Sequence, residues 1–234
     1  MISTRAAKHI SRARENGEFT DFEFTCEGHI IPVHRVIICS HSPVFQAACT
    51  GILKEASTRS YSLDSHSLAM VRRMVEFFYT SDYTEVFEEE DTGTDTIPVL
   101  LIHVAMFTLA DKYDIEELKV LSANKYSECL TKNPNVSNFL LSISEVYNST
   151  PPSARGLRDR ALAFAREKLP EFLSLSDARQ EFDEVTADSP GFIKELLYYF
   201  IEHRLLGHCN NCGGRKCGCC GKGDAIPEKL RGSR

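Results

Sequence analysis

The sequence predicts an α+β fold, with a small sheet flanked by helices and an all-helical extension behind it. Apolar and polar residues alternate at the period of a β-strand near the start of the chain. After about residue 67, apolar residues instead recur every three to four positions, which is the period of an amphipathic helix. With 234 residues, of which 42% are hydrophobic, the chain is long enough for two units with a buried core.

The expected sheet begins with a hairpin. Residues 18–26 alternate as Glu-Phe-Thr-Asp-Phe-Glu-Phe-Thr-Cys, which predicts a half-buried strand. Gly28 favours a turn, and residues 29–33 predict the returning strand. Because Pro32 has no N–H to donate, that strand is expected at an edge of the sheet or to end there. Residues 60–63 predict one more short strand.

Helices are expected before and after this hairpin. Residues 3–15 predict a short exposed helix, and residues 35–39 predict another short one. Ser42 followed by Pro43 is typical of an N-cap and a first helical position, so a third helix is expected to run to about residue 49, where Gly51 can end it.

The second half of the sequence predicts helices only. We expect them over residues 67–79, 99–112, 115–130, 136–148, 154–169 and 190–206. The proline pair at 151–152 and Pro170 are expected to break the pattern. Residues 179–189 are polar enough to form either a loop or a weak helix. Residues 85–95 carry six carboxylates, which predicts a solvated loop.

Composition excludes some classes of protein and favours others. No stretch reaches the roughly 18 to 20 apolar residues of a membrane span, and residues 97–110 predict a buried helix instead. Residues 1–14 do not match a secretory signal, although an amphipathic transit peptide stays open. We therefore expect an intracellular protein, of cytoplasm or nucleus, with its nine cysteines reduced or binding metal. The net charge of −6 argues against broad nucleic-acid binding.

Four sequence runs share one order and spacing with a known family. They are Phe19-Thr-Asp-Phe-Glu-Phe, residues 31–45 (Ile-Pro-Val-His-Arg-Val-Ile-Ile-Cys-Ser-His-Ser-Pro-Val-Phe), Phe77-Phe-Tyr-Thr-Ser and Ala110-Asp-Lys-Tyr-Asp. Over about residues 17 to 130 these runs resemble the BTB/POZ domain. Residues 146–159 are similar to the helical extension of fungal BTB proteins. The expected organisation is a helical segment 1–16, a BTB/POZ domain 17–132, a helical extension 133–206 and a cysteine-rich, flexible tail 207–234.

The resemblance also implies roles for four polar residues. Asp21 and His34 correspond to a buried polar pair between the first strand and the first helix, which would specify the fold because buried polar groups need partners. Arg35 takes the basic position after the histidine, and Ser42 takes the capping position. A catalytic role for Asp21 and His34 would need a nucleophile with a local signature, and none accompanies them. We therefore expect no enzyme.

The resemblance implies a protein-interaction module that acts as a scaffold or adaptor. A homodimer is expected, with residues 5–20 contributing the contact; alternatively, Ile10 and its neighbours cover only their own domain. Some BTB proteins recruit a cullin ubiquitin ligase through an apolar residue, any residue and then glutamate. The matched positions here read Val71-Arg72-Arg73, so the motif departs at Arg73 and a cullin adaptor is the weaker alternative.

The tail predicts a possible metal site. Cys209 and Cys212 form one Cys-x-x-Cys-Gly turn, and Cys217 and Cys220 form another, so four thiolates suit tetrahedral zinc. The spacer of four residues is shorter than in common zinc ribbons, and Cys219 and His208 are other candidate ligands.

An unstructured thiol-rich tail and redox or iron–sulfur chemistry stay open as alternatives to zinc. A zinc-binding tail would make the chain a transcriptional regulator, but no aromatic residue accompanies the basic residues there, which argues against nucleic-acid contact. Four further cysteines are expected to be small core residues: Cys26, Cys39, Cys49 and Cys129.

Overall fold

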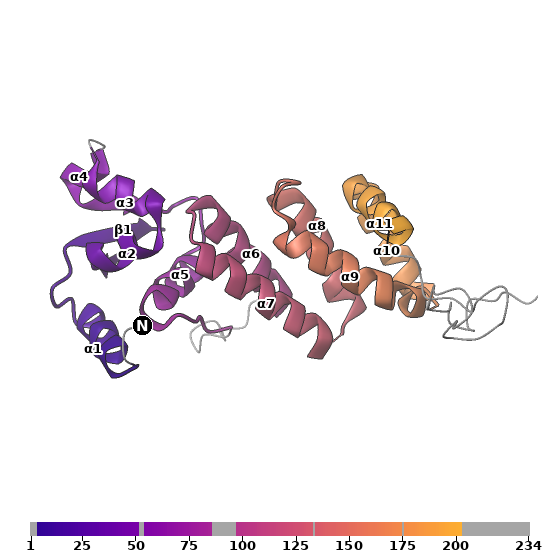
Figure 1. The fold of residues 1–234 in the computed structure, drawn as a ribbon, viewed down its shortest axis with the longest axis horizontal. Helices are drawn as coiled ribbons and strands as arrows, with labels where there is room; N and C mark the ends of the chain where they lie inside the picture. Colours follow the sequence, from indigo (N-terminus) through magenta and orange to yellow (C-terminus); the bar gives the residue numbers. More distant parts are fainter. Residues whose placement is uncertain (1–3, 52–53, 86–96, 133, 175, 203–234) are drawn as a thin grey trace, which may run out of the picture.

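A computed structural model describes residues 4–51, 54–85, 97–132, 134–174 and 176–202. The sheet lies near one end of an elongated molecule and the last helices lie at the other (Figure 1). In chain order the elements are α1 (Thr4–Glu15), β1 (Phe22–Cys26), β2 (His29–Val33), α2 (Arg35–His41), α3 (Pro43–Thr50), α4 (Lys54–Thr58), β3 (Ser60–Ser62), α5 (Leu68–Thr80), α6 (Val99–Lys112), α7 (Glu116–Lys132), α8 (Val136–Ser149), α9 (Arg155–Phe172), α10 (Ser176–Asp188) and α11 (Pro190–Glu202).

The sheet has the order β2-β1-β3, with β1 and β2 antiparallel and β3 parallel to β1. The predicted hairpin is confirmed, and Pro32 lies on the edge strand as expected. Strand β1 begins at Phe22, later than predicted, because Gly17 and Phe19 have φ angles of 69° and 60° and turn the chain after α1. Helix α4 was not predicted.

The first core surrounds Phe45 of α3. Its ring centroid lies 4.9 Å from that of Phe24 on β1 and 4.9 Å from that of Tyr113, on which it stacks. Phe78 of α5 meets the same ring edge-on at 6.1 Å. The sheet, α3, α5 and the end of α6 are therefore held by one aromatic cluster.

Helix α6 separates two cores. Ile102, Met106 and Leu109 face the core of the sheet, whereas Val104 and Phe107 belong to the core of the following helices. The buried helix predicted over residues 97–110 is confirmed as α6, and the structure shows that two of its faces are buried. Helices α6 and α7 contribute side chains to both cores, so the cores do not separate two units at one point of the chain. The domain boundary expected near residue 132 therefore stays a prediction.

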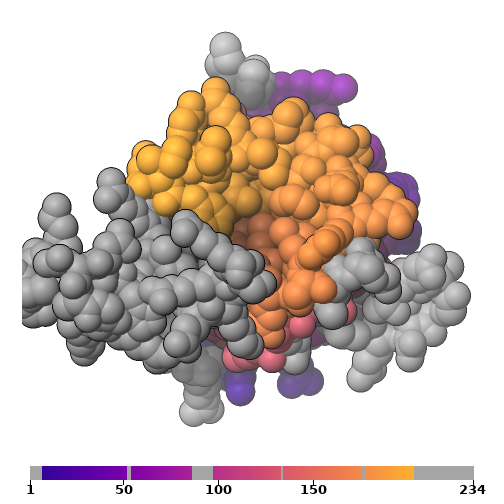
Figure 2. Space-filling view, turned by 90° about the vertical axis from the view of Figure 1, so that its right-hand side faces the viewer, coloured from indigo at the N-terminus to yellow at the C-terminus, as the bar shows by residue number. Residues whose placement is uncertain are grey.

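Beyond the sheet, the helices stack as successive pairs, α6 with α7, α8 with α9, and α10 with α11 (Figure 1). Figure 2 views the far end of this stack, where α10 and α11 form the surface. Residues 179–189 were expected to form either a loop or a weak helix, and the structure shows a helix, α10, over all but the last of them. Phe182 and Val185 of this helix pack against the second core, which stabilises it. Residues 203–206 of the predicted last helix lie outside the described part of the chain.

The expected break at Pro170 is wrong. Pro170 lies in the last turn of α9, which runs on to Phe172. A proline there removes only one late backbone hydrogen bond, and its side chain is exposed. Leu169 is buried in the second core and Phe172 packs against it, so packing maintains the helix beyond the proline.

Candidate functional site

His34 organises the junction between α1, β2 and α5. It is 8% exposed, and its Nδ1 lies 2.9 Å from the hydroxyl of Tyr79. The backbone N–H of His34 donates a hydrogen bond to the same hydroxyl oxygen at 3.0 Å. The hydroxyl has one proton, which it donates to Nδ1, so Nδ1 is the acceptor. His34 Nε2 then carries the ring proton and donates to the carbonyl of Glu18 at 3.0 Å. Burial raises the pKa of Tyr79, which keeps this hydroxyl protonated.

The expected buried pair is therefore correct for His34 and wrong for Asp21. Asp21 is exposed, and its Oδ1 accepts a hydrogen bond from the backbone N–H of Arg35 at 2.8 Å, the first residue of α2. A carboxylate at a helix N-terminus satisfies a free donor and needs no burial. Tyr79 supplies the partner for His34 that sequence reasoning assigned to Asp21.

Arg35 and Ser42 also connect elements. The guanidinium of Arg35 donates to the carbonyl of Cys49 in the last turn of α3. Ser42 is 1% exposed; its Oγ accepts from the N–H of Phe45 at 3.1 Å and donates to the carbonyl of Tyr113 at 2.6 Å. The N-cap of α3 is thus as predicted, and the same hydroxyl also binds α3 to the end of α6.

Replacing Tyr79 by phenylalanine is expected to lower the free energy of unfolding by about 1–3 kcal/mol, because it leaves the buried N–H and Nδ1 of His34 without a partner. Urea denaturation measures the change. Tyr198→Phe is the control, since the Tyr198 side chain is 53% exposed and should lose less than about 0.5 kcal/mol. Equal losses in both variants would contradict the role of this junction.

A cleft of about 490 Å³ lies between α1, β2 and α5. Arg14 and Tyr79 form part of its wall, with the Arg14 guanidinium 5.5 Å from the centroid of the Tyr79 ring. Ile30 and Val75 supply apolar parts of the wall. Within the described part of the chain, Arg14 Nε is buried without a hydrogen-bond partner.

Three large apolar side chains near the start of the chain are exposed, and one of them, Ile30, lines this cleft. Phe19 is 88% exposed, Ile30 on β2 is 65% exposed and Val36 on α2 is 74% exposed. By contrast, Ile10 of α1 packs against the first core, as the alternative interpretation of that helix predicts. The exposed apolar surface at this end therefore comes from the chain after α1 and from the sheet edge.

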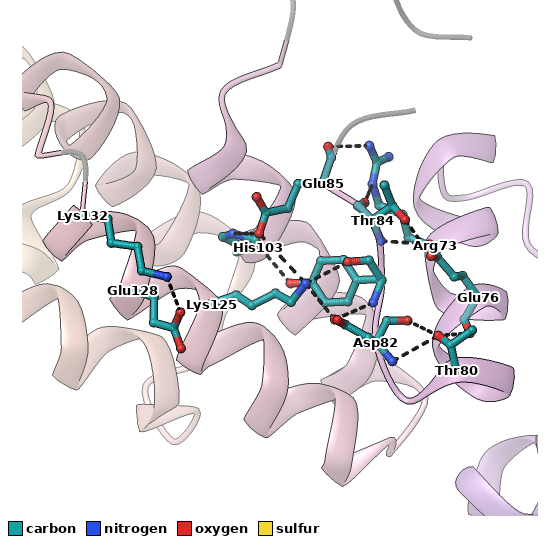
Figure 3. Close-up of polar contacts among 11 residues, drawn as sticks. Arg73, Glu76, Thr80, Asp82, Thr84, Glu85, His103, Lys125, Glu128 and Lys132 are labelled. Atoms are coloured by element: carbon teal, nitrogen blue, oxygen red, sulfur yellow. Dashed lines mark hydrogen bonds and ion pairs between the residues drawn. The ribbon is translucent and has the colours of Figure 1, made fainter. Parts of the chain in front are cut away.

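A second polar cluster anchors residues 82–85 to α5, α6 and α7 (Figure 3). Arg73 is fully buried, and its Nε and Nη2 donate to the carbonyls of Thr84 and Glu85 at 2.9 and 3.0 Å. Arg73 thus binds backbone carbonyls of its own chain and does not present its charge at the surface, so whether the chain recruits a cullin stays a prediction. The sequence shows only the charge of this residue, not its inward direction.

His103 of α6 and Lys125 of α7 complete the cluster. Lys125 lies 2.7 Å from the Asp82 carboxylate, donates to the carbonyl of Tyr83 at 2.8 Å and lies 4.3 Å from the centroid of its ring. His103 is fully buried, and its Nδ1 lies 2.8 Å from the Tyr83 hydroxyl. These residues fix the chain immediately before the acidic segment. Sequence reasoning noted His103 only as an interruption of an apolar run.

The expected metal ligands Cys209, Cys212, Cys217 and Cys220 lie outside the described residues, so zinc stays a prediction. The described residues contain no group of three or more His, Cys, Asp or Glu side chains that could hold a metal. Cys26 and Cys49 are buried, as expected of core residues, while the remaining two described cysteines, Cys39 and Cys129, are partly buried. Burial raises the pKa of Cys49 to about 12, which makes it an unreactive thiol.

The profile of the BTB/POZ domain matches residues 10–129, which is half of the chain. The chain belongs to the BTB/POZ family. This confirms the predicted resemblance and the α+β fold with its helical extension. The BTB/POZ fold is a protein-interaction fold, so contact with other proteins is the general function of the domain. The fungal type of the extension stays a prediction.

Relatives of the BTB/POZ chain include mouse TD and POZ domain-containing protein 2, 26% identical over 66% of this chain and 38% of the relative. Protein maternal effect lethal 26 of Caenorhabditis elegans is 31% identical over 62% of this chain and 32% of the relative. The BTB domain of human gigaxonin aligns with a TM-score of 0.40 and 20% identity, covering 53% of this chain and 89% of that domain. The chain thus spans well under half the length of these curated relatives. Among the described residues, no helix is both long and apolar enough to cross a membrane.

Proposed function

We propose that this BTB/POZ chain is an interaction module that pairs with a second copy of itself through the surface around the cleft of α1, β2 and α5. Such a dimer would place the helical extensions at the outer ends, where they can present other partners. The observation that carries the proposal is the exposure of Phe19, whose side chain is 88% open to solvent.

Phe19 has two unfavourable features in an isolated chain. Its large apolar ring is exposed, and its backbone has a φ of 60°, a left-handed conformation that bulky residues rarely adopt. Backbone conformations of this kind cost on the order of 1–3 kcal/mol and tend to occur at functional sites. Burial against a second copy would remove the ring from water and offset that cost.

The neighbouring surface supports the same interpretation. Ile30 is 65% exposed on the free edge of β2, and edge strands with exposed apolar residues favour association.

Light scattering on the full chain is expected to give the mass of a dimer. The double variant Phe19→Ser with Ile30→Ser should weaken dimerisation by at least about tenfold, because buried aromatic anchors dominate interface energies. Val120→Ser with Leu141→Ser is the matched control, since these side chains are 50% and 49% exposed on α7 and α8. A monomeric wild-type chain at tens of micromolar, or equal weakening by the control, would contradict the proposal.

Two alternatives from the sequence remain predictions. For a cullin adaptor, the departure of the motif at Arg73 was the argument against, and Arg73 is buried inside the chain. The interpretation as a transcriptional regulator depends on zinc ligands after residue 202, outside the described part of the chain. A pull-down with cullins and a measurement of bound zinc after dialysis test the two separately.

A further inference from the structure

The last two helices that the structure describes, α10 and α11, differ in their exposed side chains, and several of those on α11 are apolar. On α11, Phe192 and Leu196 face the second core, whereas Leu197, Tyr198 and Ile201 are 58%, 53% and 61% exposed. Stacks of helical pairs bury each pair against the next, and the last pair is expected to have a polar outer face. An uncovered apolar stripe on the terminal helix therefore indicates that another element covers it.

The partner helix of this last pair is strongly acidic. Helix α10 carries five carboxylates and one arginine, and Asp183, Glu184 and Asp188 are exposed. Helices α10 and α11 pack on each other and together form the end of the stack (Figure 2). The end surface thus combines an apolar stripe with a negative helix, so its occupant should carry apolar residues and positive charge.

Residues 203–234 have this composition and begin where α11 ends. They contain seven Lys and Arg residues against two carboxylates. Leu205, Leu206, Ile226 and Leu230 supply apolar side chains. The thirteen residues of α11 extend over about 20 Å, a distance that about six extended residues can span, so a segment of this length can return along both helices.

We propose that residues 203–234 fold back over the end of the stack and cover the surface of α10 and α11. Their cations would lie against Asp183, Glu184 and Asp188, and their apolar residues against Leu197 and Ile201. Direct attachment to α11 gives the segment a millimolar effective concentration at this surface, which a separate partner rarely reaches. A second copy fits less well, because pairing two such ends would bring two acidic α10 helices together.

Carbodiimide cross-linking of the full chain tests this contact. The reagent joins a lysine amine to a nearby carboxylate, so we expect products that link Lys216, Lys222 or Lys229 to the carboxylates of α10. The reaction is run on an equal mixture of unlabelled and ¹⁵N-labelled chains. Links within one chain support the proposal, whereas products that join a light chain to a heavy chain show a second copy and overturn it. The absence of such links also overturns it.

Matched variants of the full chain show whether the contact is specific. Asp183→Asn with Glu184→Gln should lower cross-linking at Asp188 by about fivefold, because two ion pairs are lost. Glu117→Gln with Glu145→Gln changes the net charge equally on exposed positions of α7 and α8 and should leave the yield unchanged. Circular dichroism confirms that both variants fold. An equal decrease in both would show non-specific attraction and overturn the proposal.

The apolar half of the contact has its own variant. Leu197→Ser with Ile201→Ser should also lower the yield at Asp188. The control Val120→Ser with Leu141→Ser should not, although it removes two apolar side chains that are 50% and 49% exposed. An unchanged yield in the α11 variant would overturn the apolar contact. This inference concerns the end of the molecule opposite α1 and does not depend on pairing through Phe19, so the two proposals fail separately.

Discussion

Replacing Arg158 by alanine is expected to lower the free energy of unfolding by about 2–4 kcal/mol, because it removes a buried side chain with charge-assisted hydrogen bonds to Glu195 and Thr150. Arg158 of α9 is 4% exposed, and its Nη1 lies 2.9 Å from Oε1 of Glu195 on α11. Its Nε donates to the hydroxyl of Thr150 at 3.2 Å, and its guanidinium lies 4.3 Å from the centroid of the Tyr147 ring. One side chain therefore holds α8, α9 and α11 together.

Arg155 provides the control for this prediction. It binds the other oxygen of the same Glu195 carboxylate at 2.8 Å, but its side chain is 43% exposed. Arg155→Ala should therefore cost less than about 1 kcal/mol, as is usual for exposed ion pairs. Urea denaturation of the two variants measures the difference. Similar losses would mean that the burial of Arg158 does not matter to the stability of the extension.

The second large predicted effect is a loss of folding stability at acidic pH that arises from His103. Burial is the largest cause that lowers the pKa of His103 from 6.5 to about 4, and the nearby cations Lys125 and Arg73 contribute to the same shift. The Glu128 carboxylate acts in the opposite direction and is the smallest of these causes. The Glu85 carboxylate lies 3.6 Å from Nε2 of His103, but its side chain is 45% exposed, so solvent screens its charge. The folded protein therefore holds this imidazole neutral.

A base with a lowered pKa in the folded state makes the protein less stable in acid, because the unfolded chain binds the proton first. The contribution of His103 is fully present above about pH 6.5 and is lost as the pH falls toward 4. The shift corresponds to about 3 kcal/mol. Between pH 6.5 and pH 4, the free energy of unfolding of the wild type should therefore decrease by about 3 kcal/mol more than that of a chain without His103.

His103→Asn is the appropriate comparison, because the asparagine amide can take the place of Nδ1 beside the Tyr83 hydroxyl without titrating. Urea denaturation between pH 7 and pH 4 is measured on both chains, and the difference between the two curves isolates His103. All other titrating groups, such as His66 with its lowered pKa, occur in both chains. Parallel curves across this range would refute the assignment.

Local sequence patterns determined most of the elements. The hairpin of β1 and β2, the N-cap at Ser42 and the apolar helix α6 follow from alternation, capping chemistry and helical periodicity, which act within a few residues. These signals need no knowledge of distant parts of the chain. The same signals failed at Pro170, where contacts of Leu169 and Phe172 with other helices outweighed the local preference.

Only the tertiary structure decided which partner each polar residue has. His34 binds Tyr79, 45 positions later, rather than Asp21, and Arg158 reaches Glu195 across 37 positions. Arg73 has the charge of a surface residue but points inward to backbone carbonyls. Charge and spacing along a chain do not show the direction of a side chain, because direction depends on how distant helices pack. The sequence by itself thus determined most of the elements and the family, while packing decided the partners of the polar side chains.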